Sequence, residues 1–240
     1  MTDIDPRLRT ALAAQLGQWR SALEGGAERV GWKLGIGDRE SIGPGPVIGH
    51  LTSATQLDPA STFPATGAMA LHADAEVAVQ VGRAVDPGSD LAGAREAIAG
   101  FGSALELVDL GGPPDDPQGV VAANVFHRAF ALGPLDAQPP ADRVEGRLIV
   151  NGETRVAATA ARDFPETVRA VAALLGAMGE RLEAGDVLIT GSVVQLPVDP
   201  GDEVIANMGQ LGRVGLTVAD SRAIRAPLGQ AGASLPAEDA

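Results

Sequence analysis

The sequence predicts an α+β domain built on a rolled or barrel-like mixed β-sheet. Many segments have the alternation or the β-branched composition of strands, whereas only two or three helices are indicated, and they do not alternate regularly with the strands. The pair Asn151 and Gly152 lies between two strand-like runs, which is a strong signal of a hairpin. A chain of 240 residues with 45% apolar and 20% charged residues can bury one substantial core.

The first part of the chain is expected to hold a helix and a group of short strands. Residues 7–24 place apolar side chains at helical spacing, and Gly25 and Gly26 end the pattern. The Pro- and Gly-rich segment "GIGDRESIGPGPVIGH" predicts turns around short strands such as 47–51. The apolar positions of the helix are Leu8, Leu12, Leu16, Trp19 and Leu23.

The middle of the chain is expected to alternate between strands and breaks. Residues 71–82 are a predicted strand, Ser89 or Asp90 caps a predicted helix that runs to about Gly100, and "GSALELVDL" has a strand-like composition. The segment "GGPPDDPQG" is predicted to hold no regular structure, because Pro and Gly dominate it, and "NVFHRAFALG" is another predicted strand.

The last part of the chain is expected to combine a hairpin, a helix and a second group of strands. The hairpin is "GRLIVNGETRVAATA". In "DFPETVRAVAALLGAMGERL", Asp163 is the predicted N-cap, Pro165 lies near the first turn and Glu166 takes the capping-box position. Residues 184–218 predict three strands, separated by Gly-Asp turns at 185–186 and 201–202.

Charge and composition argue against several classes of partner. The formal net charge of −13 disfavours a nucleic acid or an anionic membrane, because both need a basic surface. No apolar run reaches the roughly 18 residues of a membrane span, and the start of the chain lacks the features of a signal peptide. The chain has no cysteine, which rules out disulfides and thiolate chemistry. These features favour a cytoplasmic location.

The segment "LHADAEVAVQVG" places acidic residues inside an apolar strand. Alternation puts Asp74 and Glu76 on one face, and Glu106 has a similar setting in "SALELVD". Buried carboxylates need a cation, hydrogen-bond donors or water. If the three converge, hard oxygen ligands in a chain without cysteine favour Mg²⁺, Mn²⁺ or Ca²⁺ over zinc. The alternative is a solvated sheet face, on which such acids are common.

Lys33 is the only lysine of the chain and lies in the apolar stretch "VGWKLGIG". It is either a cation of a functional site or a stem packed on apolar surface with its head in water. Two histidines also stay open from the sequence. His127 is either an acid/base group or structural, and His72 shares the acidic face of its strand.

Eight short motifs, taken in order, resemble the fumarylacetoacetate hydrolase superfamily. The likeness covers roughly residues 28–219 and is nearest to the 2-keto-4-pentenoate hydratases and the 4-oxalocrotonate decarboxylases. The motifs are "GWKLG", "DAEVAVQVGR", "ALELVD", "AANVFHRAFALG", "VNGE", "LEAGDVLITGS", "PGDEV" and "LGRVGLTV".

This resemblance implies a mixed β-roll and a divalent metal ion, usually Mg²⁺ and alternatively Mn²⁺, held at the positions of Asp74, Glu76 and Glu106. Asp74 stands where the family commonly has Glu, so its reach is one methylene shorter. Lys33 matches the lysine of the G-W-K motif and is the implied catalytic residue. The positions implied to contact substrate are Asn124, Thr190, Gly191 and Ser192.

The activity that the resemblance implies is that of a metal-dependent lyase of aromatic catabolism, which hydrates a 2-hydroxy-2,4-dienoate to a 4-hydroxy-2-oxo acid. A 4-oxalocrotonate-type decarboxylase, an acylpyruvate-type C–C hydrolase and a non-catalytic scaffold relative are the alternatives. The implied partners are a small 2-oxo or 2-hydroxy acid and further copies of the chain in a homo-oligomer. We expect a helical segment at 1–27, a catalytic β-roll domain at 28–219 and a flexible tail at 220–240.

Overall fold

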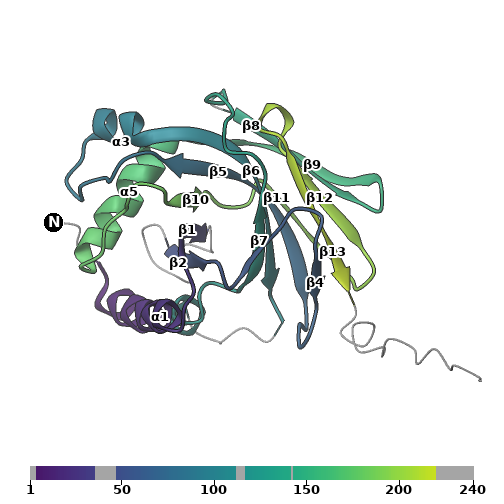
Figure 1. Cartoon of the computed structure of the whole chain (residues 1–240), viewed down its shortest axis with the longest axis horizontal. Coiled ribbons are helices and arrows are strands. Elements are labelled where there is room, and N and C mark those ends of the chain that lie inside the picture. The colour runs from purple at the N-terminus through teal and green to yellow at the C-terminus, as the bar shows by residue number, and fades with distance from the viewer. Residues whose placement is uncertain (1–3, 36–46, 112–116, 142, 220–240) are drawn as a thin grey trace, which may run out of the picture.

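The computed structural model describes residues 4–35, 47–111, 117–141 and 143–219, and its framework is two curled sheets (Figure 1). The predicted tail, 220–240, lies outside the described residues. The helices are α1 (Pro6–Glu24), α3 (Leu91–Ala97), α4 (Pro117–Ala122) and α5 (Phe164–Ala177), with a 3-10 turn at Gly209–Leu211. The strands are β1 (Arg29–Gly35), β2 (Val47–Thr52), β3 (Gln56–Leu57), β4 (Thr62–Pro64), β5 (Leu71–Val81), β6 (Ile98–Asp109), β7 (His127–Leu132), β8 (Arg143–Val150), β9 (Glu153–Ala161), β10 (Val187–Ile189), β11 (Val194–Pro197), β12 (Glu203–Asn207) and β13 (Arg213–Ala219).

Both sheets mix parallel and antiparallel neighbours. The larger sheet has the order β2-β1-β10-β5-β6-β7-β3, with β11 also paired to β5, and the smaller has the order β4-β13-β12-β8-β9. The pairs β1 with β10, β3 with β7 and β4 with β13 are parallel, and the others are antiparallel. The predicted α+β fold with a rolled mixed sheet is therefore confirmed.

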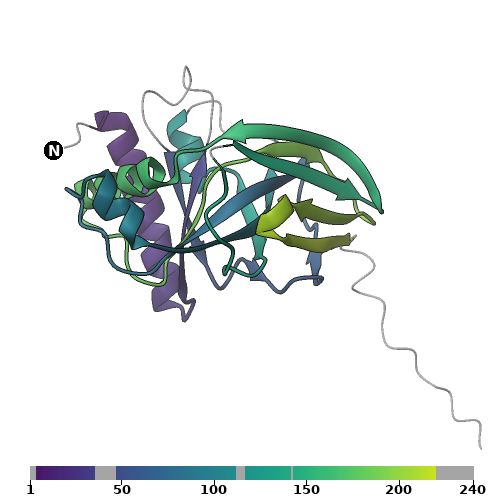
Figure 2. The same cartoon turned by 90° about the horizontal axis from the view of Figure 1, so that it is seen from above.

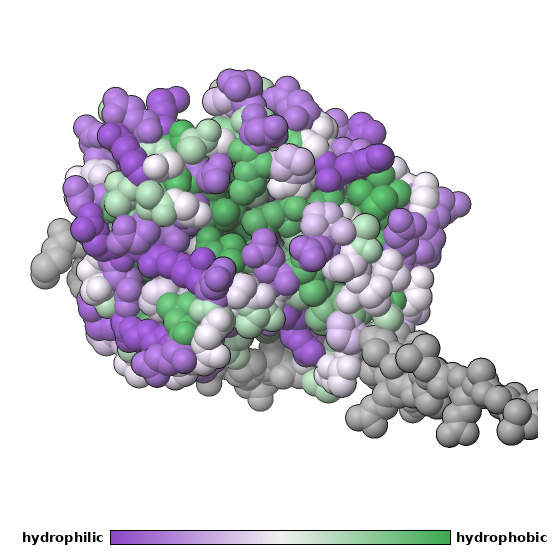
Figure 3. All heavy atoms as spheres, viewed as in Figure 1, coloured by the Kyte–Doolittle hydropathy of each residue, from purple (hydrophilic) through white to green (hydrophobic). Residues whose placement is uncertain are grey.

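The helices gather at one end of the molecule and the smaller sheet at the other. Figures 1 and 2 place α1, α3 and α5 together, and the β8–β9 hairpin with β12 and β13 at the opposite end. Figure 3 shows a mostly hydrophilic rim around an apolar area near β5 and β6 on the face seen in Figure 1. Among the described helices, none is long and apolar enough to cross a membrane.

The N-terminal helix packs on the edge of the larger sheet. Asp5 caps α1 by accepting a hydrogen bond from the Arg7 amide, and the buried Gln15 amide donates to the carbonyls of Ile48 and Val121. The Trp19 ring lies 5.1 Å from the Trp32 ring of β1, centroid to centroid. These contacts hold β1 and β2 in place, and β1 carries Lys33.

Several local predictions are confirmed. Helix α1 covers the expected 7–24, Asp163 is the N-cap of α5, and the β8–β9 hairpin turns at the expected pair. Asn151 and Gly152 have φ values of 51° and 82°, as a two-residue turn of type I′ requires.

Other local predictions are wrong, and two of them concern segments that pair with β5. The helix after Asp90 ends at Ala97 rather than near Gly100, since residues 98–109 extend along β5 as a full-length partner strand. The 184–218 region forms four strands rather than three, because Gly191, with φ of +92°, separates β10 from β11.

The other two corrections concern the chain before β7. Residues 117–119 of the segment expected to be irregular belong to α4, because a proline is well tolerated in a first helical turn. The strand expected over "NVFHRAFALG" begins only at His127. Before it, Asn124, Val125 and Phe126 all have positive φ, at 60°, 53° and 63°.

Candidate metal centre and active site

The three acids singled out in the sequence meet on one face of the β5–β6 pair. Asp74 lies directly opposite Glu106 in the antiparallel register, and Glu76 follows two residues along β5 on the same face. One carboxylate oxygen from each lies within 4.8 Å of those of the other two. The exposed fractions are 5% for Asp74 and 1% for each glutamate, so a solvated sheet face does not describe them.

Glu106 is held by two donors on the same oxygen. The Lys33 ammonium, from β1, lies 2.5 Å from Glu106 Oε1, and His127 Nδ1, from β7, lies 2.6 Å from that atom. Burial alone would raise the pKa of the Glu106 carboxyl, but the Lys33 charge and the His127 hydrogen bond outweigh it and hold that pKa below its usual value. Glu106 is therefore ionised at neutral pH.

Lys33 is not the snorkelling surface lysine that the sequence left open. Its residue is 2% exposed, and its ammonium donates to the Val125 carbonyl at 3.0 Å in addition to contacting Glu106. An ammonium has three N–H donors, so these two contacts with described residues leave one for a ligand. The close passage of Lys33 also explains Gly49 on β2, since a Cβ there would lie 2.7 Å from Lys33 Cγ.

Glu76 is held from the β10–β11 connection. The Gly191 amide donates to Glu76 Oε2 at 2.6 Å, and the Arg162 guanidinium donates to the carbonyls of Gly191 and Ser192. Burial, followed by the Glu106 and Asp74 charges, raises the pKa of the Glu76 carboxyl well above its usual value. Three crowded carboxylates beside one lysine thus carry more negative charge than the protein alone balances.

Asp74 shows most directly that the cluster suits a cation. Its Oδ1 is buried with no hydrogen-bond partner among the described residues. Burial, and next the Glu106 charge, raise the pKa of Asp74 to about 7. A hard divalent ion accepts carboxylate oxygens at this spacing and supplies the missing positive charge, so the residues present fit a Mg²⁺ or Mn²⁺ ion.

The predicted substrate-contacting residues border this cluster. The Thr190 hydroxyl donates to the Val77 carbonyl at 3.1 Å, the Gly191 amide faces Glu76, and Ser192 Oγ is buried with no partner among the described residues. Asn124 already uses its amide, because Oδ1 accepts from the His50 amide and Nδ2 donates to the His50 carbonyl.

His72 and Asp109 lie outside the cluster. Among the described residues, His72 Nδ1 contacts only the carbonyl of Ala70, which precedes β5, at 3.0 Å. The Asp109 carboxylate accepts from the amides of Met69, Ala70 and Gly111.

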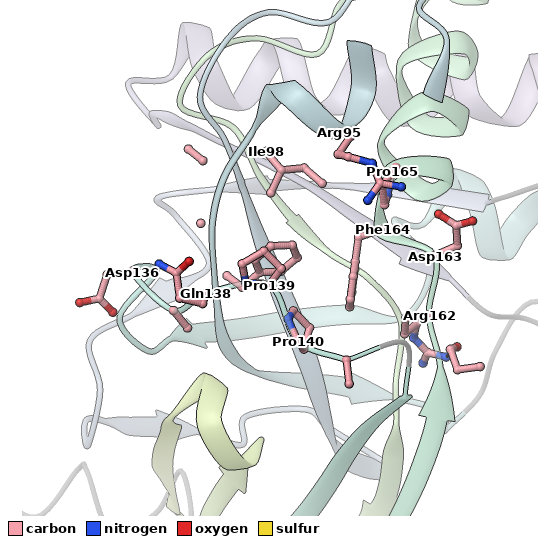
Figure 4. Close-up of a pocket in the computed structure, with 16 residues that line it drawn as sticks. Arg95, Ile98, Asp136, Gln138, Pro139, Pro140, Arg162, Asp163, Phe164 and Pro165 are labelled. Carbon is pink, nitrogen blue, oxygen red and sulfur yellow. Dashed lines mark hydrogen bonds between the residues drawn. The ribbon is translucent and has the colours of Figure 1, made fainter. Parts of the chain in front are cut away.

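A cavity of about 770 Å³ opens elsewhere in the molecule and does not contain this cluster (Figure 4). It is walled by Phe164, by Pro139 and Pro140, and by Arg95, and none of the three clustered carboxylates lines it. Arg162 joins the two regions, because it lines the cavity and also donates to the Gly191 carbonyl. The acid, amine and imidazole groups lie together at the carboxylates, so we place the candidate active site there.

The contacts of His127, Val125 and Arg162 were not found from the sequence. His127 was left open, and the other two gave no signal, because each touches the cluster from a distant part of the chain. The Val125 carbonyl reaches Lys33, 92 residues away, and Arg162 reaches Gly191, 29 residues away. Main-chain contacts of this kind leave no residue pattern.

The model of the fumarylacetoacetate (FAA) hydrolase C-terminal family matches residues 44–219, so the chain belongs to the fumarylacetoacetate hydrolase family. Among curated protein sequences, none matches the chain.

Several solved structures share the fold. A 4-oxalocrotonate decarboxylase from Pseudomonas putida G7, complexed with magnesium and adipate, superposes with a TM-score of 0.78 at 22% identity, covering 88% of this chain and 86% of that one. A fumarylpyruvate hydrolase from Pseudomonas aeruginosa, in complex with Mn²⁺ and pyruvate, superposes with a TM-score of 0.63 at 17% identity, covering 80% of this chain and 90% of that one. A 2-hydroxyhepta-2,4-diene-1,7-dioate isomerase from Mycobacterium marinum superposes with a TM-score of 0.63 at 21% identity, covering 81% of this chain and 75% of that one.

Proposed function

We propose that the protein is a metal-dependent lyase that adds water to a 2-hydroxy-2,4-dienoate and yields a 4-hydroxy-2-oxo acid. The observation that carries the proposal is the buried group of Asp74, Glu76 and Glu106 beside the lysine amine. Family membership and the fold shared with metal-containing enzymes support it. A non-catalytic scaffold would have no reason to bury three acids around one unpartnered oxygen.

Asp74, Glu76 and Glu106 would hold Mg²⁺ or Mn²⁺. When bound, the ion supplies Lewis-acid stabilisation of negative charge on the C2 oxygen of a 2-oxo acid. The protein prepares this site in two ways: the Gly191 amide fixes Glu76, and Lys33 with His127 fixes Glu106. The carboxylates therefore need little reorganisation on binding.

Lys33 would act at the C2 oxygen of the substrate. Two contacts, to Glu106 and to the Val125 carbonyl, orient its ammonium and leave one N–H. That N–H would donate to the oxygen and stabilise the enolate charge that develops there. Burial excludes water from this hydrogen bond and strengthens it.

The stretch Thr190, Gly191 and Ser192 would bind the substrate carboxylate and its chain. Ser192 Oγ is buried next to the Asp74 carboxyl, where its hydroxyl could turn to a ligand. Asn124 stays a predicted substrate contact, although it would have to exchange its bonds with the main chain of His50 to reach a ligand. The partner that follows from this site is a small 2-oxo or 2-hydroxy acid, and assembly as a homo-oligomer and a cytoplasmic location stay predictions.

Decarboxylation of a 4-oxalocrotonate-type diacid is the second candidate. The fold superposes with a TM-score of 0.78 on the decarboxylase but only 0.63 on the hydrolase and the isomerase. The same residues would serve this reaction, because electrons released with CO₂ also collect as enolate charge at the C2 oxygen.

A spectrophotometric assay with 2-hydroxypenta-2,4-dienoate and with 2-hydroxymuconate, with and without Mg²⁺, tests the proposal. Mg²⁺-dependent loss of dienoate absorbance without CO₂ release is the expected result. Release of CO₂ from the diacid would establish decarboxylation instead. Turnover by the Glu76→Ala variant at the parental rate would rule out the proposed site.

A further inference from the structure

His127 is a buried histidine whose contacts the proposed reaction does not explain. Its side chain is 2% exposed, and both ring nitrogens have partners: Nδ1 lies 2.6 Å from Glu106 Oε1, and Nε2 lies 2.9 Å from Thr55 Oγ1. Its ring also packs 5.8 Å from that of Phe130, centroid to centroid. The ring is therefore fixed on three sides.

The partners define which nitrogen carries the proton. An ionised carboxylate only accepts hydrogen bonds, so Nδ1 must donate to Glu106. In the neutral ring Nε2 is then an acceptor, and the Thr55 hydroxyl, which also reaches the Thr52 carbonyl at 3.3 Å, is the group that lies 2.9 Å from it. Glu106 thus selects the tautomer that presents an N–H to it, and the Thr55 contact holds the other side of the ring.

The two Glu106 oxygens differ in their contacts. Oε1 takes both the Lys33 ammonium and the His127 N–H, and neither of these contacts uses Oε2. An ammonium alone is a point charge on a flexible stem and leaves the carboxylate free to turn. The imidazole adds a second, directional bond, which fixes Oε1 and leaves Oε2 for a ligand.

The backbone before β7 places His127 in this position. Asn124, Val125 and Phe126 form three successive left-handed residues, a conformation that costs energy for side chains other than glycine. Asn124 ties this turn to β2 through both hydrogen bonds with His50. The turn delivers the Val125 carbonyl to Lys33 and, two residues later, the imidazole to Glu106.

We propose that His127 is a positioning residue, which holds Glu106 in the orientation that binds a divalent cation, and that Thr55 holds the imidazole ring in place. This inference rests on the proposed metal site. It differs from a catalytic role, because the ring faces Glu106 and Thr55.

Mn²⁺ binding to the full chain, measured by titration calorimetry, tests the proposal without substrate. His127→Phe keeps the ring volume but removes the donor, and we expect its Mn²⁺ affinity to fall about 10- to 100-fold. His127→Asn can present an amide N–H near the position of Nδ1, so its affinity should lie nearer to wild type. His72→Phe is the matched control and should leave the affinity unchanged, because among the described residues His72 Nδ1 contacts only the Ala70 carbonyl.

Thr55→Val keeps the imidazole and decides the question even if His127→Phe does not fold. Loss of one hydrogen bond should weaken Mn²⁺ binding about fivefold. Wild-type affinity in both Thr55→Val and a folded His127 variant would overturn the role of His127 and leave the metal site intact. A wild-type chain that binds no Mn²⁺ would instead overturn the proposed function itself.

Discussion

Replacing Asp74 with Asn is expected to stabilise the metal-free protein at alkaline pH. Burial and the Glu106 charge raise the pKa of Asp74 from 3.8 to about 7. The ionised carboxylate therefore costs free energy in the fold: the cost is absent below pH 3.8, grows as the pH rises and is complete above pH 7. At 1.36 kcal/mol per pKa unit, the difference between the two values gives about 4 kcal/mol.

Denaturant unfolding in EDTA measures this effect. At pH 8, Asp74→Asn should exceed wild type in free energy of unfolding by up to about 4 kcal/mol, an upper limit because Glu76 can hold the proton instead. At pH 5 the advantage should shrink to about 2 kcal/mol, because wild-type Asp74 is then protonated in the fold. Asp136→Asn, at an exposed position, is the control and should change stability by less than about 0.5 kcal/mol. An Asp74→Asn protein no more stable than wild type at pH 8 would refute the reasoning.

Two further substitutions probe the ligand set and the sheet that supports it. Wild type should gain about 2.7 kcal/mol of stability from Mg²⁺ at a hundredfold excess over its dissociation constant, and Glu76→Gln should gain nothing in the same thermal unfolding assay; equal gains would contradict the site. Gly31→Ala should cost at least about 2 kcal/mol, because its Cβ would lie 2.0 Å from the Val187 carbonyl oxygen where β1 pairs with β10. Gly17→Ala is the matched control in α1, where a Cβ meets nothing within 4 Å, and should be neutral or stabilising by up to about 1 kcal/mol. A Gly31→Ala protein as stable as wild type would refute the close approach of β1 and β10.

The sequence predicted the parts of the site that depend on local pattern. Period-two alternation placed Asp74 and Glu76 on one face, and the apolar setting of Glu106 marked it as a third member. The register that sets Glu106 opposite Asp74 belongs to the pairing of β5 with β6, which no local pattern specifies. The local sequence pattern could therefore suggest the three members of the cluster but could not predict that they lie side by side.

The parts that escaped prediction are those that depend on contacts between distant segments. The strand expected from Asn124 onward has strand-like residues, yet its first three residues take a left-handed turn because Asn124 is bonded to β2 and Val125 to Lys33. The role of His127 could not be predicted for the same reason, because its contacts with Glu106 and Thr55 define that role. Tertiary contacts override local preference at a functional site, where strain is often tolerated.

The central claim is that Asp74, Glu76 and Glu106 jointly bind one divalent cation next to Lys33. A crystal structure of the Mn²⁺-soaked protein, with anomalous scattering recorded for manganese, tests it most directly. The account predicts one anomalous peak between the three carboxylates, with an oxygen of each at a distance on the order of 2.1 Å. Carboxylates that share protons with one another and enclose no peak would contradict it.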